Sequence, residues 1–174
     1  MLPALPAQLA SLPERHVILL MGPPTSGRTT LAEHLFPNHA KMNSSTKLPG
    51  QSPFAQLKSL FDTHGRVLVD KTHGSVKNRA KVVKACISLG ADVYAVWVTA
   101  PLRACLAVRI TRNHWSGGAV EHMKVPAYSE YAEEFETPTL SEGFASITTI
   151  PWYVCLSYYA FPVFDMITCL CSVL

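Results

Sequence analysis

Short apolar runs alternate along this chain with segments of helical periodicity. Three runs predict buried strands, because each is short, continuous and rich in branched side chains: residues 16–21, 66–70 and 92–98. Shorter strands are predicted at residues 39–43 and 145–150. Helical patterns lie between them, at residues 29–35, 53 to about 65, 75–89, 102–112 and 127–135. This alternation predicts right-handed crossovers and an α/β fold with a mostly parallel, doubly wound sheet.

Two of the predicted helices have informative faces. The helix that follows an N-cap at Ser52 places its apolar side chains together: Phe54, Leu57, Leu60 and Phe61. The helix at 75–89 places basic side chains toward solvent: Lys77, Arg79, Lys81 and Lys84. Such a face either follows the phosphates of a nucleic-acid strand or is the hydrated side of a helix, and the second explanation is the commoner. Residues 113–125 contain two glycines and no periodicity, which predicts a flexible loop.

The strand at 16–21 runs directly into a glycine-bearing loop and a helix. The loop has the spacing G-x-x-x-x-G-K-[ST], with Arg28 in the place of the lysine. Its backbone N–H groups and the helix dipole are suited to a polyphosphate, and Thr29 is placed to offer a hydroxyl to Mg²⁺. We expect the phosphates of ATP to bind at Gly22, Pro23, Pro24, Thr25, Ser26, Gly27, Arg28, Thr29 and Thr30. The alternative is an ordinary strand-to-helix turn.

The length of 174 residues allows one α/β domain with a real core. We expect an N-terminal arm at 1–14, the domain at 15–152 and an apolar tail at 153–174. The net charge of +3 allows a nucleic-acid partner without requiring one. Five cysteines without metal-ligand spacing, and no secretory signal at the start, predict a reducing intracellular location.

The tail has one charged residue, Asp165, and about the length of a membrane span. Pro162 near its middle and the absence of basic flanks argue against a membrane anchor. The remaining alternatives are a splice variant, a retained intron or gene-model error, and a packed pair of strands.

Four segments together resemble the kinase domain of the polynucleotide kinase/phosphatase family of DNA repair, over roughly residues 15–152. They are the phosphate-binding loop, residues 67–73, residues 98–112, and a closing segment. This last segment has Val125-Pro126, then Tyr131, then the block 135–144, which reads F-E-T-P-T-L-S-E-G-F. The family's closing block commonly reads F-E-x-P-T-L-x-E-G-F. The resemblance implies a P-loop kinase-like three-layer sandwich that uses ATP and Mg²⁺. It also implies transfer of the γ-phosphate to the 5′-hydroxyl of a DNA or RNA end, by a nuclear or cytoplasmic protein that we expect to be a monomer.

The resemblance also assigns roles to single residues. Arg112 matches a lid arginine that stabilises charge developing on the transferred phosphoryl group. Asp70 matches a strand-end aspartate that holds Mg²⁺, together with Thr29. Ser45 occupies the position of the family's general base, because Asn43-Ser44-Ser45 stands where the family has N-x-D.

Several positions depart from the family pattern. Serine cannot act as a base near neutral pH, Arg28 replaces lysine, and Lys71 and His73 replace two asparagines. These departures keep open a catalytically impaired relative that binds nucleotide or nucleic acid. A small-molecule kinase on the same fold is a third alternative, and the 135–144 block argues against it. No phosphatase domain is expected, because no D-x-D-x-T motif is present.

Overall fold

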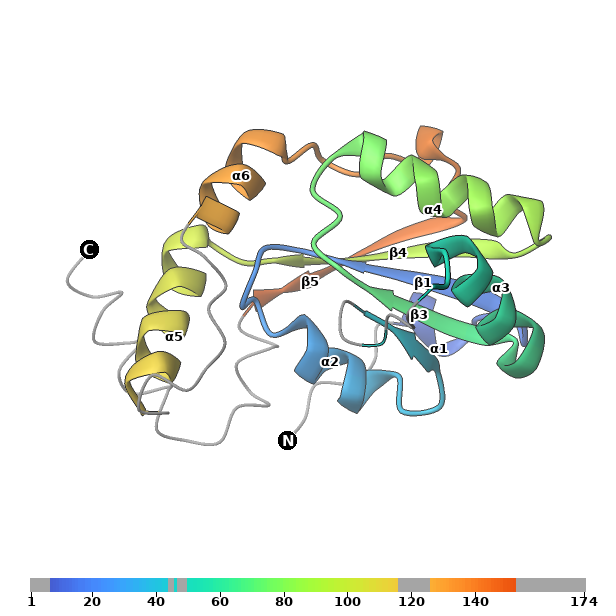
Figure 1. The fold of residues 1–174 in the computed structure, drawn as a ribbon, viewed down its shortest axis with the longest axis horizontal. Helices are drawn as coiled ribbons and strands as arrows, with labels where there is room; N and C mark the ends of the chain where they lie inside the picture. Colours follow the sequence, from blue (N-terminus) through green and yellow to red (C-terminus); the bar gives the residue numbers. More distant parts are fainter. Residues whose placement is uncertain (1–6, 44–45, 47–49, 116–125, 153–174) are drawn as a thin grey trace.

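A five-stranded, all-parallel sheet forms the centre of the protein (Figure 1). The computed structural model describes residues 7–43, 46, 50–115 and 126–152. The strand order is β2-β3-β1-β4-β5. The strands are β1 (His16–Met21), β2 (Ala40–Met42), β3 (Arg66–Asp70), β4 (Asp92–Thr99) and β5 (Ser146–Pro151). The predicted parallel, doubly wound α/β fold is confirmed.

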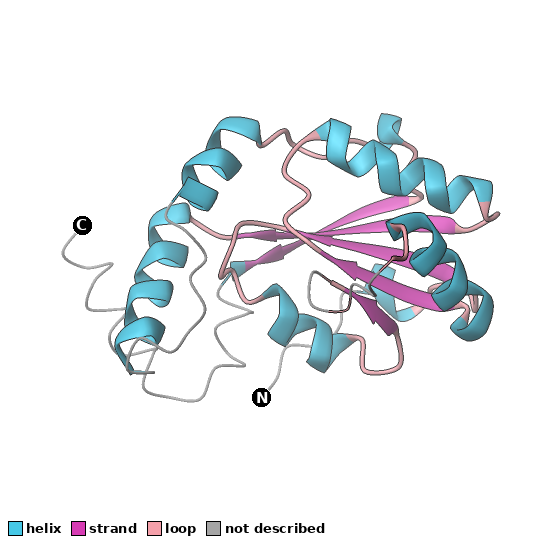
Figure 2. Ribbon diagram, viewed as in Figure 1, coloured by secondary structure: helices cyan, strands magenta, loops and turns pink. Residues whose placement is uncertain are grey.

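Helices cover both faces of the sheet, which gives three layers (Figure 2). The helices are α1 (Ala7–Ala10), α2 (Arg28–Leu35), α3 (Pro53–His64), α4 (Val76–Ser88), α5 (Leu102–Trp115) and α6 (Pro126–Glu134), with a 3₁₀ turn η1 (Leu140–Glu142). Side chains of α3 and α4 pack on one face, and those of α1 and α2 on the other. Helices α5 and α6 lie beside the end of the sheet where β1 leads into α2 (Figure 1).

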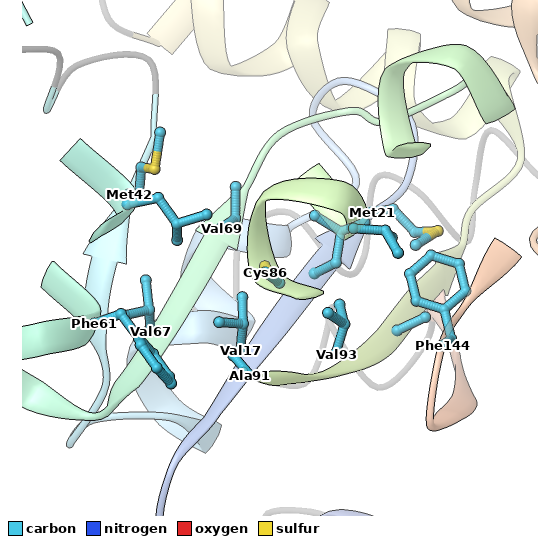
Figure 3. Close-up of a cluster of buried hydrophobic side chains, with 14 residues drawn as sticks. Val17, Met21, Met42, Phe61, Val67, Val69, Cys86, Ala91, Val93 and Phe144 are labelled. Carbon is cyan, nitrogen blue, oxygen red and sulfur yellow. The ribbon is translucent and has the colours of Figure 1, made fainter. Parts of the chain in front are cut away.

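Strand β1 is buried on both faces, as its unbroken apolar pattern predicts. Its alternate residues Val17, Leu19 and Met21 join the core under α3 and α4, where Figure 3 shows Val17 near Cys86. Ile18 and Leu20 face the opposite core, with α1 and α2. The parallel register sets Leu20 beside Asp70, so the ends of β1 and β3 lie together.

Some expectations about single helices are wrong. Arg79 is fully buried, although its helix was expected to present it to solvent. Phe54, on the predicted apolar face of α3, is 46% exposed, whereas Leu57 and Phe61 are buried. Helix α5 continues through 113–115, which were expected to be loop, because neither glycine nor proline interrupts it before Ser116.

The regions expected outside the domain are only partly described. Within the expected arm, Leu9 of α1 is 5% exposed and packs into the core with Ile18. The expected tail, 153–174, lies outside the described residues, as do 116–125. Among the helices that are described, none combines the length and apolar character needed to cross a membrane.

Two histidines meet at the amino end of β1. His16 Nε2 lies 2.8 Å from His39 Nε2, and His16 Nδ1 lies 2.6 Å from the Pro13 carbonyl oxygen. Burial, together with the neighbouring His16 and Arg66, lowers the pKa of His39 to about 4. The pKa of His16 is also lowered, mainly by burial. Both rings are therefore neutral in the folded protein near pH 7.

Candidate functional site

The loop between β1 and α2 has a backbone that only glycine accepts at its two ends. Gly22 has φ of 149°, and a Cβ there would lie 2.8 Å from the Val98 carbonyl oxygen. Gly27 has φ of 86° and is the N-cap of α2, with no side-chain cap. The first N–H groups of a helix have no acceptor within the helix. The first N–H groups of α2 are therefore suited to bind an anion.

Asp70 meets the start of α2 at the carboxyl edge of the sheet. Thr29 Oγ1 donates a hydrogen bond of 2.6 Å to Asp70 Oδ2. Asp70 is 7% exposed, and its other oxygen, Oδ1, is buried without a hydrogen-bond partner among the described residues. Mg²⁺ prefers oxygen ligands and takes one or two from protein, the rest from phosphates and water. The Thr29 hydroxyl and the Asp70 carboxylate supply oxygens of this kind, so these two residues suit Mg²⁺.

The guanidinium of Arg28 folds back into the loop. Arg28 Nη1 donates to the Gly22 carbonyl oxygen, and Arg28 Nε lies 3.4 Å from Asp70 Oδ1. Burial lowers the pKa of Arg28, and the Asp70 carboxylate opposes that effect. Arg28 thus supplies positive charge beneath the loop, tethered to protein oxygens.

A cavity of about 430 Å³ lies against the loop and the start of α2. It is lined by Thr25, Ser26, Gly27, Arg28, Thr29, Thr30, Glu33 and Arg112. Six of the predicted loop residues and the predicted lid arginine therefore share one cavity. Pro23 and Pro24 line two other cavities, of about 450 and 150 Å³. Ser45 lies outside the described residues.

The block 135–144, whose sequence is the most distinctive, holds the loop that follows Asp70. Arg79 Nε and Nη2 donate to Glu142 Oε2 and Oε1, at 2.6 and 2.9 Å. Arg79 Nη1 donates to the carbonyl oxygens of His73 and Gly74, at 3.1 and 2.9 Å. Burial raises the pKa of Glu142, but hydrogen bonds from Arg79 and the Thr139 N–H outweigh it, and the pKa is lowered. The pair is ionised and joins α4, the loop and η1.

The block 135–144 also packs against neighbouring rings and accepts a hydrogen bond from the start of α4. Phe135 packs against the rings of Trp97 and Tyr131, at centroid distances of 5.4 and 5.3 Å. Glu136 Oε2 accepts a 2.8 Å hydrogen bond from the Val76 N–H at the start of α4. Within the described residues these contacts are with scaffold, so the motif acts here by placing the loop after β3.

His73, in the loop that follows β3, is buried, which the sequence pattern did not indicate. It is 6% exposed, has φ of 47°, and its Nε2 has no hydrogen-bond partner among the described residues. Burial, together with the charges of Arg28, Lys71 and Arg79, lowers the pKa of His73 to about 3. His73 is thus a buried, neutral ring near pH 7.

These buried histidines predict a pH dependence of stability. The folded pKa values of His39 and His73 lie below the unfolded value near 6.5, so the unfolded chain binds more protons in acid. The free energy of unfolding should be level above pH 7 and fall as pH drops below 6.5. Each histidine contributes a slope of up to about 1.4 kcal/mol per pH unit. Urea unfolding between pH 5 and 8 measures this, and His39→Gln should reduce the slope.

The control for that prediction is the same substitution at His64, an exposed residue at the end of α3. His64→Gln should leave the slope as it is in the original chain. An equal slope in the His39→Gln protein would contradict the prediction.

Known protein structures share the fold of this chain. No protein-family model matches the sequence. A gluconokinase from Sinorhizobium meliloti 1021 superimposes with a TM-score of 0.54 at 14% identity, over 89% of each chain. Kti12 from Chaetomium thermophilum, solved with ADP-AlF3, gives a TM-score of 0.55 at 13% identity, over 87% of this chain and 96% of that one. At such identities the likeness concerns the fold alone, and it shows that the chain has a P-loop kinase-like fold.

Proposed function

We propose that the chain binds ATP with Mg²⁺ at the loop of residues 22–29 and transfers the γ-phosphate to a hydroxyl group. The observation that supports this best is the 2.6 Å hydrogen bond between Thr29 and Asp70. It brings a loop hydroxyl and a strand-end carboxylate together at the amide end of α2. The ADP-AlF3 held by Kti12 is in keeping with a nucleotide on this fold.

Different residues of the proposed site would bind the phosphates, hold the metal ion and supply positive charge. The amides after Gly27 receive phosphate oxygens, and Thr29 and Asp70 would hold Mg²⁺. When bound, Mg²⁺ supplies positive charge to the β- and γ-phosphates. Arg28 adds charge from below the loop, and Arg112 adds it from α5 across the cavity.

The acceptor that we propose is the 5′-hydroxyl of a DNA or RNA end. Its support is the sequence of the block 135–144 and its neighbours, since the solved structures bear on the fold alone. End-processing in DNA repair is the corresponding role, and it needs little base readout.

The second candidate is a nucleotide-binding relative that transfers phosphate poorly. The geometry of Arg28 favours it, because this guanidinium is tied to the Gly22 carbonyl and to Asp70. A lysine is a compact charge on a flexible stem, whereas the planar arginine fork is held by these two oxygens. Nucleotide affinity would then survive better than transfer.

The test is ATP binding by calorimetry, before and after Gly27→Val. The side chain keeps phosphate oxygens from the amides, and losing two charge-assisted hydrogen bonds should weaken ATP about 100-fold or more. Gly90→Val is the matched control, because Gly90 also has a left-handed φ, of 66°, but nothing within 4 Å of its Cβ position. Gly90→Val should cost stability and leave ATP affinity unchanged.

The two candidates separate in a single-turnover reaction with a 5′-hydroxyl oligonucleotide and γ-labelled ATP. Labelled oligonucleotide supports the kinase, and bound ATP without transfer supports the impaired relative. No ATP affinity in the original chain, or equal affinity after Gly27→Val, would rule out both.

A further inference from the structure

The side chain of Thr25 connects the phosphate-binding loop to α5 and α6. Thr25 Oγ1 lies 2.6 Å from the Cys105 carbonyl oxygen in α5, and 2.9 Å from the Tyr128 hydroxyl in α6. The Pro24 carbonyl oxygen is also near, at 2.8 Å. A threonine hydroxyl donates one hydrogen bond and accepts others, so Thr25 donates to a carbonyl while Tyr128 donates to Thr25. One oxygen atom therefore joins three elements.

The backbone of Thr25 indicates that this connection has a cost. Its φ is 55°, a left-handed conformation that is unfavourable for a β-branched residue. Strain of this kind is on the order of 1–3 kcal/mol and persists where surrounding contacts determine it. The contacts to Cys105 and Tyr128 are of that kind, because both partners are buried. The strained position thus coincides with the link between the loop and the two helices.

Arg112 lies on the helix that Thr25 holds. It follows Cys105 by seven residues, which is two helical turns, so both lie on one side of α5. Arg112 and Thr25 line the same cavity. Helix α6 is joined to α5 as well, because the Arg109 guanidinium lies 5.9 Å from the centre of the Tyr128 ring. The position of α5 over the loop therefore sets where Arg112 can reach.

We propose that Thr25 is a positioning residue, whose hydroxyl fixes α5, and with it Arg112, over the nucleotide site. This inference rests on the proposed ATP site. According to this proposal, the Thr25 hydroxyl contributes to ATP binding through the position of Arg112. The phosphates would contact the amides of α2, which follow Thr25 in the chain. Tyr128 belongs to the same unit through its hydroxyl.

The test is a double-mutant cycle on ATP–Mg²⁺ affinity, measured by calorimetry. Thr25→Val keeps the shape and the β-branching of threonine, so backbone strain is matched and only the hydroxyl is lost. Thr25→Val and Arg112→Ala should each weaken ATP about tenfold, the loss of roughly one hydrogen bond or ion pair. The double variant should be no weaker than Arg112→Ala. Thr25→Ser should keep the affinity of the original chain. Tyr128→Phe should weaken ATP less than Thr25→Val does, because Thr25 Oγ1 keeps its contact with the Cys105 carbonyl oxygen of α5.

The control removes a hydroxyl from α6, the helix of Tyr128, at a position whose described hydrogen bond stays within that helix. Ser129 is exposed, and its hydroxyl contacts the Pro126 carbonyl oxygen at 3.0 Å, so Ser129→Ala should leave ATP affinity unchanged. Losses that add in the Thr25→Val/Arg112→Ala protein would overturn the proposal, because Thr25 would then act within the loop alone.

Hydrogen exchange without nucleotide separates this proposal from the proposed function. Thr25→Val should speed amide exchange in α5 and α6, and Thr25→Ser should not. Faster exchange in a chain that binds no ATP would keep the structural link and refute the nucleotide site. Unchanged exchange in Thr25→Val would refute the link, whatever the ATP affinity.

Discussion

Arg79→Met should lower the free energy of unfolding by about 3–5 kcal/mol, the usual cost of leaving one member of a buried ion pair without its partner. The side chain of Arg79 is 0% exposed and that of Glu142 is 6% exposed. Removing the guanidinium leaves the buried carboxylate of Glu142 without its ion-pair partner and the His73 carbonyl oxygen without this donor. The Thr139 N–H still donates to Glu142, and the Glu136 N–H still donates to the Gly74 carbonyl oxygen. Urea unfolding followed by circular dichroism measures the loss.

The matched control is Lys84→Met, which removes a positive charge from an exposed position of the same helix. It should change the free energy of unfolding by no more than about 0.5 kcal/mol. The double variant Arg79→Met/Glu142→Leu should recover most of the loss, because both charges are then gone. If Arg79→Met and Lys84→Met were equally stable, the ion pair would not hold the loop after β3.

The strands and most helices of this fold follow from local sequence. The runs at 16–21, 66–70 and 92–98 are apolar except at their end residues, and each becomes a strand of the sheet. Burial on both faces explains this directly, because neither face of the strand meets water. The loop at residues 22–29 also follows from local sequence, since its glycine spacing matches the positive φ angles of Gly22 and Gly27.

Arg79 shows where such local signals stop. Its helix carries three exposed lysines, at positions 77, 81 and 84. A fourth basic residue among them, Arg79, was therefore expected to be exposed to solvent as well. Its acceptor, Glu142, lies 63 residues away, and no local pattern pairs the two. One signal was present in the sequence: Arg79 is four residues before Val83 and seven before Cys86, both buried. Helical spacing therefore placed Arg79 on the core face.

Thr25 shows the same limit within the site itself. Its place in the loop follows from the glycine spacing, but its partners Cys105 and Tyr128 lie 80 and 103 residues away. The role of the 135–144 block was likewise hidden. Its sequence suggested family chemistry, while its described contacts include Arg79, Val76 and the rings of Trp97 and Tyr131.

The largest effect on activity is expected at Ser45. Ser45→Asp should raise the rate of phosphate transfer to a 5′-hydroxyl oligonucleotide by roughly 10²- to 10⁴-fold, the usual contribution of a positioned general base. The resemblance places the family's aspartate at this position, and serine cannot accept a proton near neutral pH. Before this position in the chain, β2 pairs in parallel with β3, and Met42 lies beside Val69.

The measurement is single-turnover transfer from γ-labelled ATP, with ATP affinity measured on the same protein. Ser45→Asn is the control, since asparagine matches aspartate in size and has no basic oxygen, so it should leave the rate unchanged. Adding Arg28→Lys to Ser45→Asp should raise the rate further, because lysine is a compact charge on a flexible stem. If the Ser45→Asp/Arg28→Lys protein bound ATP and still transferred nothing, the missing carboxylate would not be what limits activity. The loss would then lie in the acceptor groove or in the placement of Arg112.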